Sequence, residues 1–410
     1  MPKVNKWREV AVRLMNVITA MLEEDEEEDD SPMQAQPTSA KTSEALTDVS
    51  SLVITPEDRS TKNCDDRAHS YPPMKLRKPY WQSHQEILTG GMTIKFYRDE
   101  EYVSKRVKTM VLNRVTSRWN EVLDSRIKEY LEAGVIVPVE KKQVRFVAPI
   151  AIVPRHSDPS RPREVLDFTL LNRHIIDVDC VLPSRKDLVA MVQQYSYAAS
   201  IDIKSCYTNI KLHEDYRPYC CICWRGQFYM FTKVPFGIKC APACCQTVTK
   251  ALSGEATLVY LDDYLVLGRS ETEVHEKIAK QQMVLEGNGL PISVQKSCLT
   301  PKQELEYCGY RLCFGEENRG VYTTDKHLRD LSLYVKVILS KQQVDVKTWR
   351  QFLGKYNWCR ARNEDRQVHV KLVGLLNEHI ERGEAVVNLD DTSRDMLSKM
   401  VERCSLPFDY

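Results

Sequence analysis

Hydrophobic positions along the chain follow helical spacing in some stretches and strand spacing in others. Near the start, three- and four-residue steps predict an amphipathic helix over residues 1–22, with a stripe of Trp7, Val10, Leu14, Val17 and Met21. A four-residue repeat from Val115 to Leu131 predicts a helix that ends at Gly134. Runs of β-prone residues predict strands at 135–137, 144–153, 199–203 and 228–232.

Helix starts are marked by side chains able to cap the backbone N–H groups of a first turn. Ser184 followed by Asp187, and Ser270 followed by Glu273, have the spacing of capping boxes and precede apolar residues at helical spacing. After two strand-like segments within 300–313, the helical period returns and continues to the end. The pattern is therefore α+β with an all-helical C-terminal part.

Residues 23–70 have a composition that opposes folding. They begin with eight consecutive acids, Glu23 to Asp30, and continue with Ser, Thr, Pro and Gln. Few large apolar side chains are present to offset the entropy lost on ordering, so we expect an acidic, disordered linker. The acidic run is either a solvated tether, which is the simpler interpretation, or an internal mimic of nucleic acid.

Charge and cysteine content narrow the function classes. The 410 residues carry a formal charge of +1, but eight acids lie in one run, so the remainder carries +9 and is typical of proteins that meet nucleic acid. No apolar stretch approaches the roughly 20 residues that cross a bilayer, which excludes an integral membrane protein. Charges interrupt the first apolar positions, so we expect no signal peptide. Fourteen cysteines without such a signal indicate a reducing, intracellular location: nucleus, cytoplasm or a virus-like particle.

Two acid-bearing segments carry the candidate chemistry. Within residues 258–267, apolar β-prone residues flank Asp262 and Asp263, which the pattern places at the tip of a hairpin. This pair alone is an ordinary turn. Asp202 changes the interpretation because it ends another apolar strand directly before a polar turn. Carboxylates delivered by two strands are what two-metal phosphoryl transfer requires, and hard Mg²⁺ ions prefer oxygen ligands.

Five blocks of sequence resemble reverse transcriptases of the gypsy-type LTR-retrotransposon, retroviral and pararetroviral family. Residues 260–263 (YLDD) resemble its YxDD motif, and residues 200–210 (SIDIKSCYTNI) resemble its block LDLKSGYxQI. Residues 163–172 resemble the family's block WRxxVDxRxLN, and residues 234–246 resemble its block MPFGLxNAPxxFQ. Residues 349–356 resemble its block LRSFLGLxxYY. The similarity runs from about Glu129 to Arg360 in unbroken order.

The resemblance implies an α+β right-hand polymerase with fingers, palm and thumb, preceded by a disordered N-terminal arm. The fingers and the start of the palm would span 71–198. The palm, with the nucleotide pocket and primer grip, would span 199–315, and a helical thumb with a C-terminal extension would span 316–410. The thumb would carry four cations near the duplex backbone: Lys336, Lys341, Lys347 and Arg350.

The resemblance also implies roles for single residues. Asp202, Asp262 and Asp263 would be the catalytic, metal-binding acids, joined by the backbone carbonyl of Ile203, with two Mg²⁺ ions or Mn²⁺ as the cofactor. Asp263 would ligate less directly, since adjacent side chains of an extended backbone point apart. Lys296 would protonate the departing pyrophosphate, and the alternative is an ordinary solvated lysine.

Further residues would form the nucleotide pocket and hold the primer. Arg163 would lie over the triphosphate, where a planar guanidinium suits phosphate oxygens, with Arg155 or His156 assisting. Tyr207 would lie under the sugar and exclude a 2′-hydroxyl, the alternative being a core tyrosine. Gln246 would contact the nucleotide and the template strand. The pocket floor would be Phe236, Gly237, Ala241 and Pro242. The primer grip would be Tyr307, Cys308, Gly309 and Tyr310.

A cysteine-rich stretch has a competing interpretation as a zinc site. Cys220 and Cys223 have the spacing of zinc thiolate ligands, and Cys240, Cys244 and Cys245 follow. The first two fall in the hairpin before the strand at 228–232, where small apolar residues belong. Buried, reduced thiols are therefore the favoured interpretation.

We therefore expect an RNA-directed DNA polymerase, a nucleotidyltransferase that extends a DNA or RNA primer with dNTPs on an RNA or DNA template and derives from a retroelement. Cys206 stands where the family has Gly, and residues 244–245 where it has Thr-Phe, but all three acids are present. The alternatives are a domesticated scaffold that binds RNA without catalysis, and a terminal transferase. The stripe within 1–22 either packs on its own body or serves a protein partner or self-association.

Overall fold

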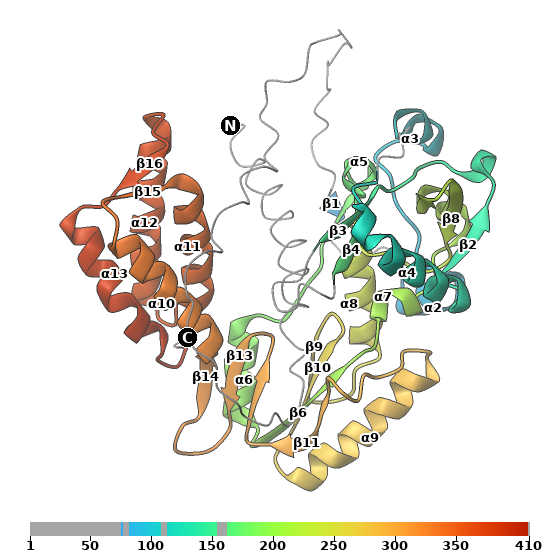
Figure 1. Cartoon of the computed structure of the whole chain (residues 1–410). Coiled ribbons are helices and arrows are strands. Elements are labelled where there is room, and N and C mark those ends of the chain that lie inside the picture. Colours follow the sequence, from blue (N-terminus) through green and yellow to red (C-terminus); the bar gives the residue numbers. More distant parts are fainter. Residues whose placement is uncertain (1–74, 77–81, 108–112, 154–161, 409–410) are drawn as a thin grey trace, which may run out of the picture.

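The computed structural model describes residues 75–76, 82–107, 113–153 and 162–408. The predicted helix over 1–22, the whole predicted linker over 23–70 and the pair Arg155 and His156 lie outside these residues. The described elements form a base with an arm on either side (Figure 1). N-terminal elements make one arm, and the helices drawn in orange to red make the other.

The base is built on one antiparallel sheet of four strands in the order β11-β6-β10-β9. Its strands are β6 (Tyr197–Asp202), β9 (Thr257–Tyr260), β10 (Asp263–Gly268) and β11 (Cys298–Lys302). Two helices pack against it, α8 (Ala241–Ala251) and α9 (Glu271–Gly287), and α6 (Arg185–Gln194) shares an apolar core with it. The capping box predicted at Ser184 and Asp187 is confirmed at the start of α6.

Strand β10 is an unbroken apolar run because both of its faces are buried. Tyr264 and Val266 belong to one hydrophobic core, whereas Leu265 and Leu267 on the opposite face belong to another. The second core continues into a three-stranded antiparallel sheet that begins with a hairpin. That sheet consists of β12 (Glu304–Tyr307), β13 (Tyr310–Cys313) and β14 (Gly320–Thr323).

The N-terminal arm combines a second three-stranded sheet with a separate two-stranded hairpin. The sheet has the order β2 (Ile136–Val139), β8 (Gln227–Phe231) and β7 (Cys221–Trp224), and the hairpin joins β3 (Ile150–Val153) to β4 (Arg163–Leu166). The short pair β1 (Lys75–Leu76) and β5 (Asp177–Val178) is parallel. The helices are α2 (His84–Gly90), α3 (Glu100–Arg106), α4 (Asn120–Glu132) and α5 (Thr169–Asn172), and α7 (Cys206–Asn209) follows β6.

Two predicted elements of this arm are shorter than expected. The strand predicted over 144–153 is confined to β3, because Pro149 has no N–H to continue a ladder and the residues before it make only an isolated bridge, between Val147 and Cys221. The helix predicted from Val115 begins at Asn120, after a 3₁₀ turn over Ser117–Trp119.

The C-terminal bundle has its own core and consists of α10 (Asp325–Leu339), α11 (Val346–Cys359), α12 (Asn363–Glu381) and α13 (Asp391–Cys404). Trp349, Phe352 and Tyr356 recur at helical spacing on α11 and are fully buried in that core. The prediction of an all-helical end is wrong in one detail, since β15 (Gln343–Asp345) pairs with β16 (Val386–Asn388).

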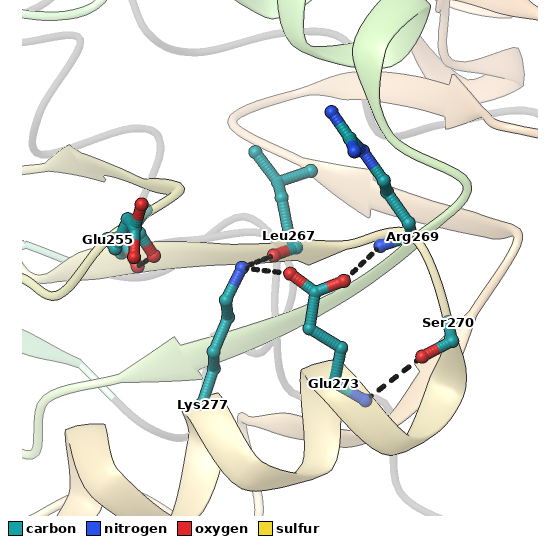
Figure 2. Close-up of polar contacts among 7 residues, drawn as sticks. Glu255, Leu267, Arg269, Ser270, Glu273 and Lys277 are labelled. Atoms are coloured by element: carbon teal, nitrogen blue, oxygen red, sulfur yellow. Dashed lines mark hydrogen bonds and ion pairs between the residues drawn. The ribbon is translucent and has the colours of Figure 1, made fainter.

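The start of α9 is tied to the end of β10 by a small polar network (Figure 2). Ser270 caps the helix by accepting from the backbone N–H of Glu273, as predicted. The Glu273 carboxylate accepts from the N–H of Arg269 at 2.7 Å and pairs with Lys277 at 2.6 Å, and these partners lower its pKa. Lys277 also donates to the carbonyl of Leu267 at 2.9 Å, so α9 is anchored to the sheet.

Gly268 is the position where this junction has no room for a side chain. A Cβ at Gly268 would lie 2.7 Å from Cγ2 of Val274 on α9. At Gly287, the last residue of α9, nothing lies within 4 Å of an added Cβ. We expect Gly268→Ala to lower the free energy of unfolding by about 1–3 kcal/mol through overpacking. Gly287→Ala is the control and should raise it by about 0.5–1 kcal/mol. Urea unfolding of both variants checks this, and equal effects would contradict the packing described.

Candidate active site

The pairing of β6 with β10 brings the three predicted acids to one end of the central sheet. Asp202 lies directly opposite Asp263, and such opposed residues have Cβ atoms about 4.5–5.5 Å apart. The N–H of Ile203 donates to the carbonyl of Asp262 at 3.1 Å, which extends the ladder beyond the strand end. All three acids are half-buried.

The turn that carries Asp262 is tight and has an unusual backbone. Tyr260 pairs with Asp263, so Leu261 and Asp262 form a two-residue hairpin loop. Leu261 is buried and adopts φ of 57°, a left-handed conformation that costs a branched residue about 1–2 kcal/mol. Burial also raises the pKa of Tyr260 to about 12, so its phenol stays neutral.

Gln246, on α8, holds this turn in place. Its side-chain oxygen accepts from the N–H of Leu261 at 2.8 Å, and its NH₂ group donates to the carbonyl of Val259 at 2.9 Å. The side chain is only 5% exposed. The sequence predicted that Gln246 touches the nucleotide and the template strand. In the structure both ends of its amide bond the turn, and the contact with the nucleotide stays a prediction.

The other acid-bearing strand is held by two serines that sequence reasoning did not single out. Ser297 accepts from the N–H of Asp202 at 3.0 Å, and the N–H of Ser293 donates to the carbonyl of Asp202 at 2.8 Å. The Ser297 hydroxyl in turn donates to the carbonyl of Ser293. Lys296 is exposed on this same loop. The sequence signal that could have indicated these contacts is the pair of serines, Ser293 and Ser297, on either side of Lys296.

The predicted primer-grip hairpin forms, with Cys308 and Gly309 at its tip and φ values of 49° and 74°. Tyr307 and Tyr310 flank the tip and are each 5% exposed. The hydroxyl of Tyr307 donates to the carbonyl of Asp263 at 3.0 Å. The two tyrosines therefore support the hairpin from inside, and contact between this hairpin and a primer stays a prediction.

The predicted nucleotide-pocket residues come from three elements. Tyr207, on α7, packs edge-on against Phe236, with ring centroids 5.1 Å apart, and Phe236 is 39% exposed. Arg163 begins β4, where the neighbouring Glu164 bonds to Tyr130 of α4. The loop that carries Phe236 lies close against β4 at Gly237. Gly237 has φ of 88°, and a Cβ there would lie 2.9 Å from the carbonyl of Leu166 on β4.

The cysteines around the site are buried. The sulfur atoms of Cys206 and Cys245 lie 3.0 Å apart, and this contact, together with burial, raises the pKa of Cys245 well above its ordinary value. Burial raises the pKa of Cys221 and Cys240 to about 12. None of the five cysteines of the zinc interpretation forms a disulfide, and all five are buried: Cys220, Cys223, Cys240, Cys244 and Cys245.

The acids fit a hard divalent cation by donor type and by backbone placement. Opposed carboxylates repel unless a cation or a proton compensates them, and carboxylate oxygens are the ligands that Mg²⁺ and Ca²⁺ take. In the described part of the chain, no group of three or more His, Cys, Asp or Glu side chains is arranged so that it could hold a metal ion. The backbone makes the three acids neighbours: β6–β10 pairing puts Asp202 opposite Asp263, and Asp262 lies in the turn between β9 and β10.

A family model described as reverse transcriptase (RNA-dependent DNA polymerase) matches residues 106–312, which include the whole central sheet and the three acids. The chain belongs to the reverse transcriptase family. Proteins of this family generally use divalent metal ions. The match also covers Gln246 and the hairpin of β12 and β13.

Curated relatives agree with this assignment. The Transposon Tf2-3 polyprotein of Schizosaccharomyces pombe is 28% identical over 245 residues, which are 58% of this chain and 17% of that protein. The Tf2-7 polyprotein of the same yeast is 27% identical over 245 residues. The chain therefore spans about a sixth of the length of these retrotransposon relatives.

Solved structures share the fold at low sequence identity. The foamy viral protease-reverse transcriptase in complex with double-stranded DNA matches with a TM-score of 0.61 and 19% identity, over 78% of this chain and 51% of that one. The same viral protein in complex with an RNA/DNA hybrid matches with a TM-score of 0.60 and 18% identity, over 78% and 39%. The expected right-hand reverse transcriptase fold is thus confirmed. Among the described helices, none has the length and apolar character needed to cross a bilayer.

The role of Gln246 can be separated from its contribution to stability. Gln281 is an equally buried amide that bonds in the same two-way manner, to the N–H of Gly254 and the carbonyl of Leu252, away from the acids. We expect Gln246→Met and Gln281→Met each to destabilise the fold by about 1–3 kcal/mol, since each leaves backbone groups unpaired. Only Gln246→Met should also lower the rate of nucleotide incorporation. Thermal denaturation with single-turnover kinetics checks this, and equal rates for the two variants would contradict it.

Proposed function

We propose that the chain is an RNA-directed DNA polymerase that extends a primer with dNTPs on an RNA template. The observation that carries the proposal is the placement of Asp202 opposite Asp263, with Asp262 in the adjoining turn, at one end of the central sheet. Membership of the reverse transcriptase family supports it. The retrotransposon relatives favour a retroelement as the source.

In this proposal the acids provide the ligands for divalent metal, taken to be two Mg²⁺ ions, with Mn²⁺ as an alternative. When bound, such a pair activates the primer's 3′-hydroxyl and stabilises the charge that develops on the departing pyrophosphate. Asp202 and Asp262 hold the cations, the carbonyl of Ile203 assists, and Asp263 opposite Asp202 adds negative charge. Lys296, which is exposed on the loop that binds Asp202, would supply a proton to the departing pyrophosphate.

The chain's other residues orient the substrates. Arg163 on β4 binds the triphosphate, and Tyr207 with Phe236 forms the wall beneath the sugar. The tip of the β12–β13 hairpin contacts the primer end. Four exposed cations on α10, α11 and the segment between them would neutralise duplex phosphates: Lys336, Lys341, Lys347 and Arg350.

The proposed subdivision follows the right-hand fold. Residues 71–198 provide the fingers and the start of the palm, 199–315 the palm, and 316–410 the thumb with its extension. Within this division β14 pairs with β13, so the first strand after residue 315 is structurally continuous with the palm. Duplex nucleic acid is the proposed ligand, and the foamy viral neighbours were solved with double-stranded DNA and with an RNA/DNA hybrid.

Primer extension on a defined RNA template tests the function directly. We expect Asp202→Asn and Asp262→Asn each to lower the rate by at least about a hundredfold, because each removes a charge from the site where cations stabilise the transition state. Asp263→Asn should have a smaller effect. Glu255→Gln, an exposed acid in the loop before β9, is the control and should retain full activity. Tight primer–template binding with no extension by the wild type would favour the RNA-binding scaffold, and extension without a template would favour a terminal transferase.

Tyr207 tests the choice of sugar. Its ring is buried against the partly exposed Phe236, so truncation opens space where a 2′-hydroxyl would lie. We expect Tyr207→Ala to raise the use of ribonucleotides relative to deoxynucleotides by about tenfold. Tyr207→Phe keeps the ring and should leave the ratio unchanged. Competition between dNTPs and rNTPs measures it, and an unchanged ratio for Tyr207→Ala would assign the tyrosine to the core alone.

A further inference from the structure

The C-terminal end of α11 in the bundle is satisfied by residues of the base. The last carbonyls of a helix have no partners within it and carry its negative dipole end. Arg185 of α6 donates to the carbonyls of Trp358 and Arg360 at 3.1 and 2.9 Å and approaches that of Asn357 at 3.5 Å. Thr323 of β14 donates to the carbonyl of Cys359 at 3.3 Å.

Arg185 also contacts the segment that follows α13. Its guanidinium lies over the ring of Phe408, 4.9 Å from the centroid. Phe408 is 6% exposed, and its N–H donates to the carbonyl of Val321 on β14 at 2.9 Å. The segment after α13 therefore lies against the base, and Arg185 contacts both this segment and the end of α11.

The joint is continuous with the hairpin next to the acids. Trp358, whose carbonyl Arg185 binds, stacks on Tyr310 with centroids 4.9 Å apart, and Phe408 meets the same ring edge-on at 5.4 Å. A Cβ at Gly309 would lie 3.2 Å from the Trp358 ring, so hairpin tip and indole are in close contact. Tyr307, three residues before Tyr310, bonds the carbonyl of Asp263.

We propose that Arg185 is a positioning residue that fixes the C-terminal bundle against the base, and so determines how long the bundle retains the duplex between nucleotide additions. This inference rests on the proposed polymerase function. The planar, forked guanidinium donates to several carbonyls at once and stacks on Phe408, which a lysine cannot reproduce. Loss of Arg185 leaves the end of α11 short of donors, so the bundle loosens while the acids and their supports stay in place.

The experiment compares Arg185→Met with Arg394→Met. Arg394 of α13 donates to the carbonyls of Leu339 and Lys341 at the end of α10 at 2.9 and 2.6 Å, so it makes the same kind of contact wholly within the bundle. The length of extension per binding event is measured in the presence of a primer–template trap. A second measurement is the rate of adding the first nucleotide from the preformed complex.

We expect Arg185→Met to shorten extension per binding event about tenfold, since charge-assisted hydrogen bonds of this kind hold the bundle in place. Arg185→Lys should restore part of the length. The first-nucleotide rate should be unchanged, and Arg394→Met should match the wild type in both measurements. Equal extension lengths for the Arg185→Met and Arg394→Met variants, measured at equal folded fractions, would overturn the proposal. If Arg185→Met does not fold, a wild-type extension length for Arg185→Lys would overturn it.

Amide hydrogen exchange separates this inference from the polymerase function because it needs no activity. Arg185→Met should speed exchange in residues 355–361 and 405–408, while exchange within α13 stays as in the wild type. Wild-type exchange in both segments would refute the joint. If the wild type does not extend primers but Arg185→Met speeds exchange as stated, the polymerase proposal fails and the joint stands.

Discussion

The register of β6 against β10 is the constraint on which the candidate site depends. A shift of one residue would move Asp202 away from Asp263 and turn every side chain of β10 to the opposite face. Such a shift is strongly opposed, because Tyr264 and Leu265 are fully buried in two different cores on the two faces. Hydrophobic packing on both sides of one strand thus determines where the charged groups at its end must lie.

Around this strand pair the backbone takes conformations that isolated peptides avoid. Ser205 after β6, Leu261 in the β9–β10 turn and Cys308 at the hairpin tip all have positive φ. Such conformations persist only where surrounding contacts compensate for them. For Leu261 the compensation is visible as burial and the bond from its N–H to Gln246. The β12–β13 hairpin contributes from the other side, since Tyr307 reaches Asp263 and Tyr310 stacks on Trp358 of the bundle.

Local sequence was sufficient for elements whose stability is mostly local. The caps at Ser184 and Ser270 and the amphipathic α10 and α11 are confirmed, because capping and helical periodicity involve neighbours within one or two turns. It failed over 144–153, where β-prone composition suggested one long strand. Strand length depends on an available partner, and among the described residues β4 pairs with this segment only along Ile150–Val153. The pairing of β15 with β16 was missed for the same reason.

For the candidate site, the sequence by itself determined the chemistry: three carboxylates at strand ends, in the order and context that identify the reverse transcriptase family. Only the tertiary structure decided which residues hold these carboxylates and which residue holds the C-terminal bundle beside them. Gln246 bonds a turn fifteen residues away, Ser297 bonds Asp202 across 95 residues, and Arg185 reaches Arg360 across 175. Nothing in a local pattern distinguishes a glutamine, serine or arginine that makes such a bond from one that faces water. The difference arises only when burial of the apolar faces has brought distant segments together.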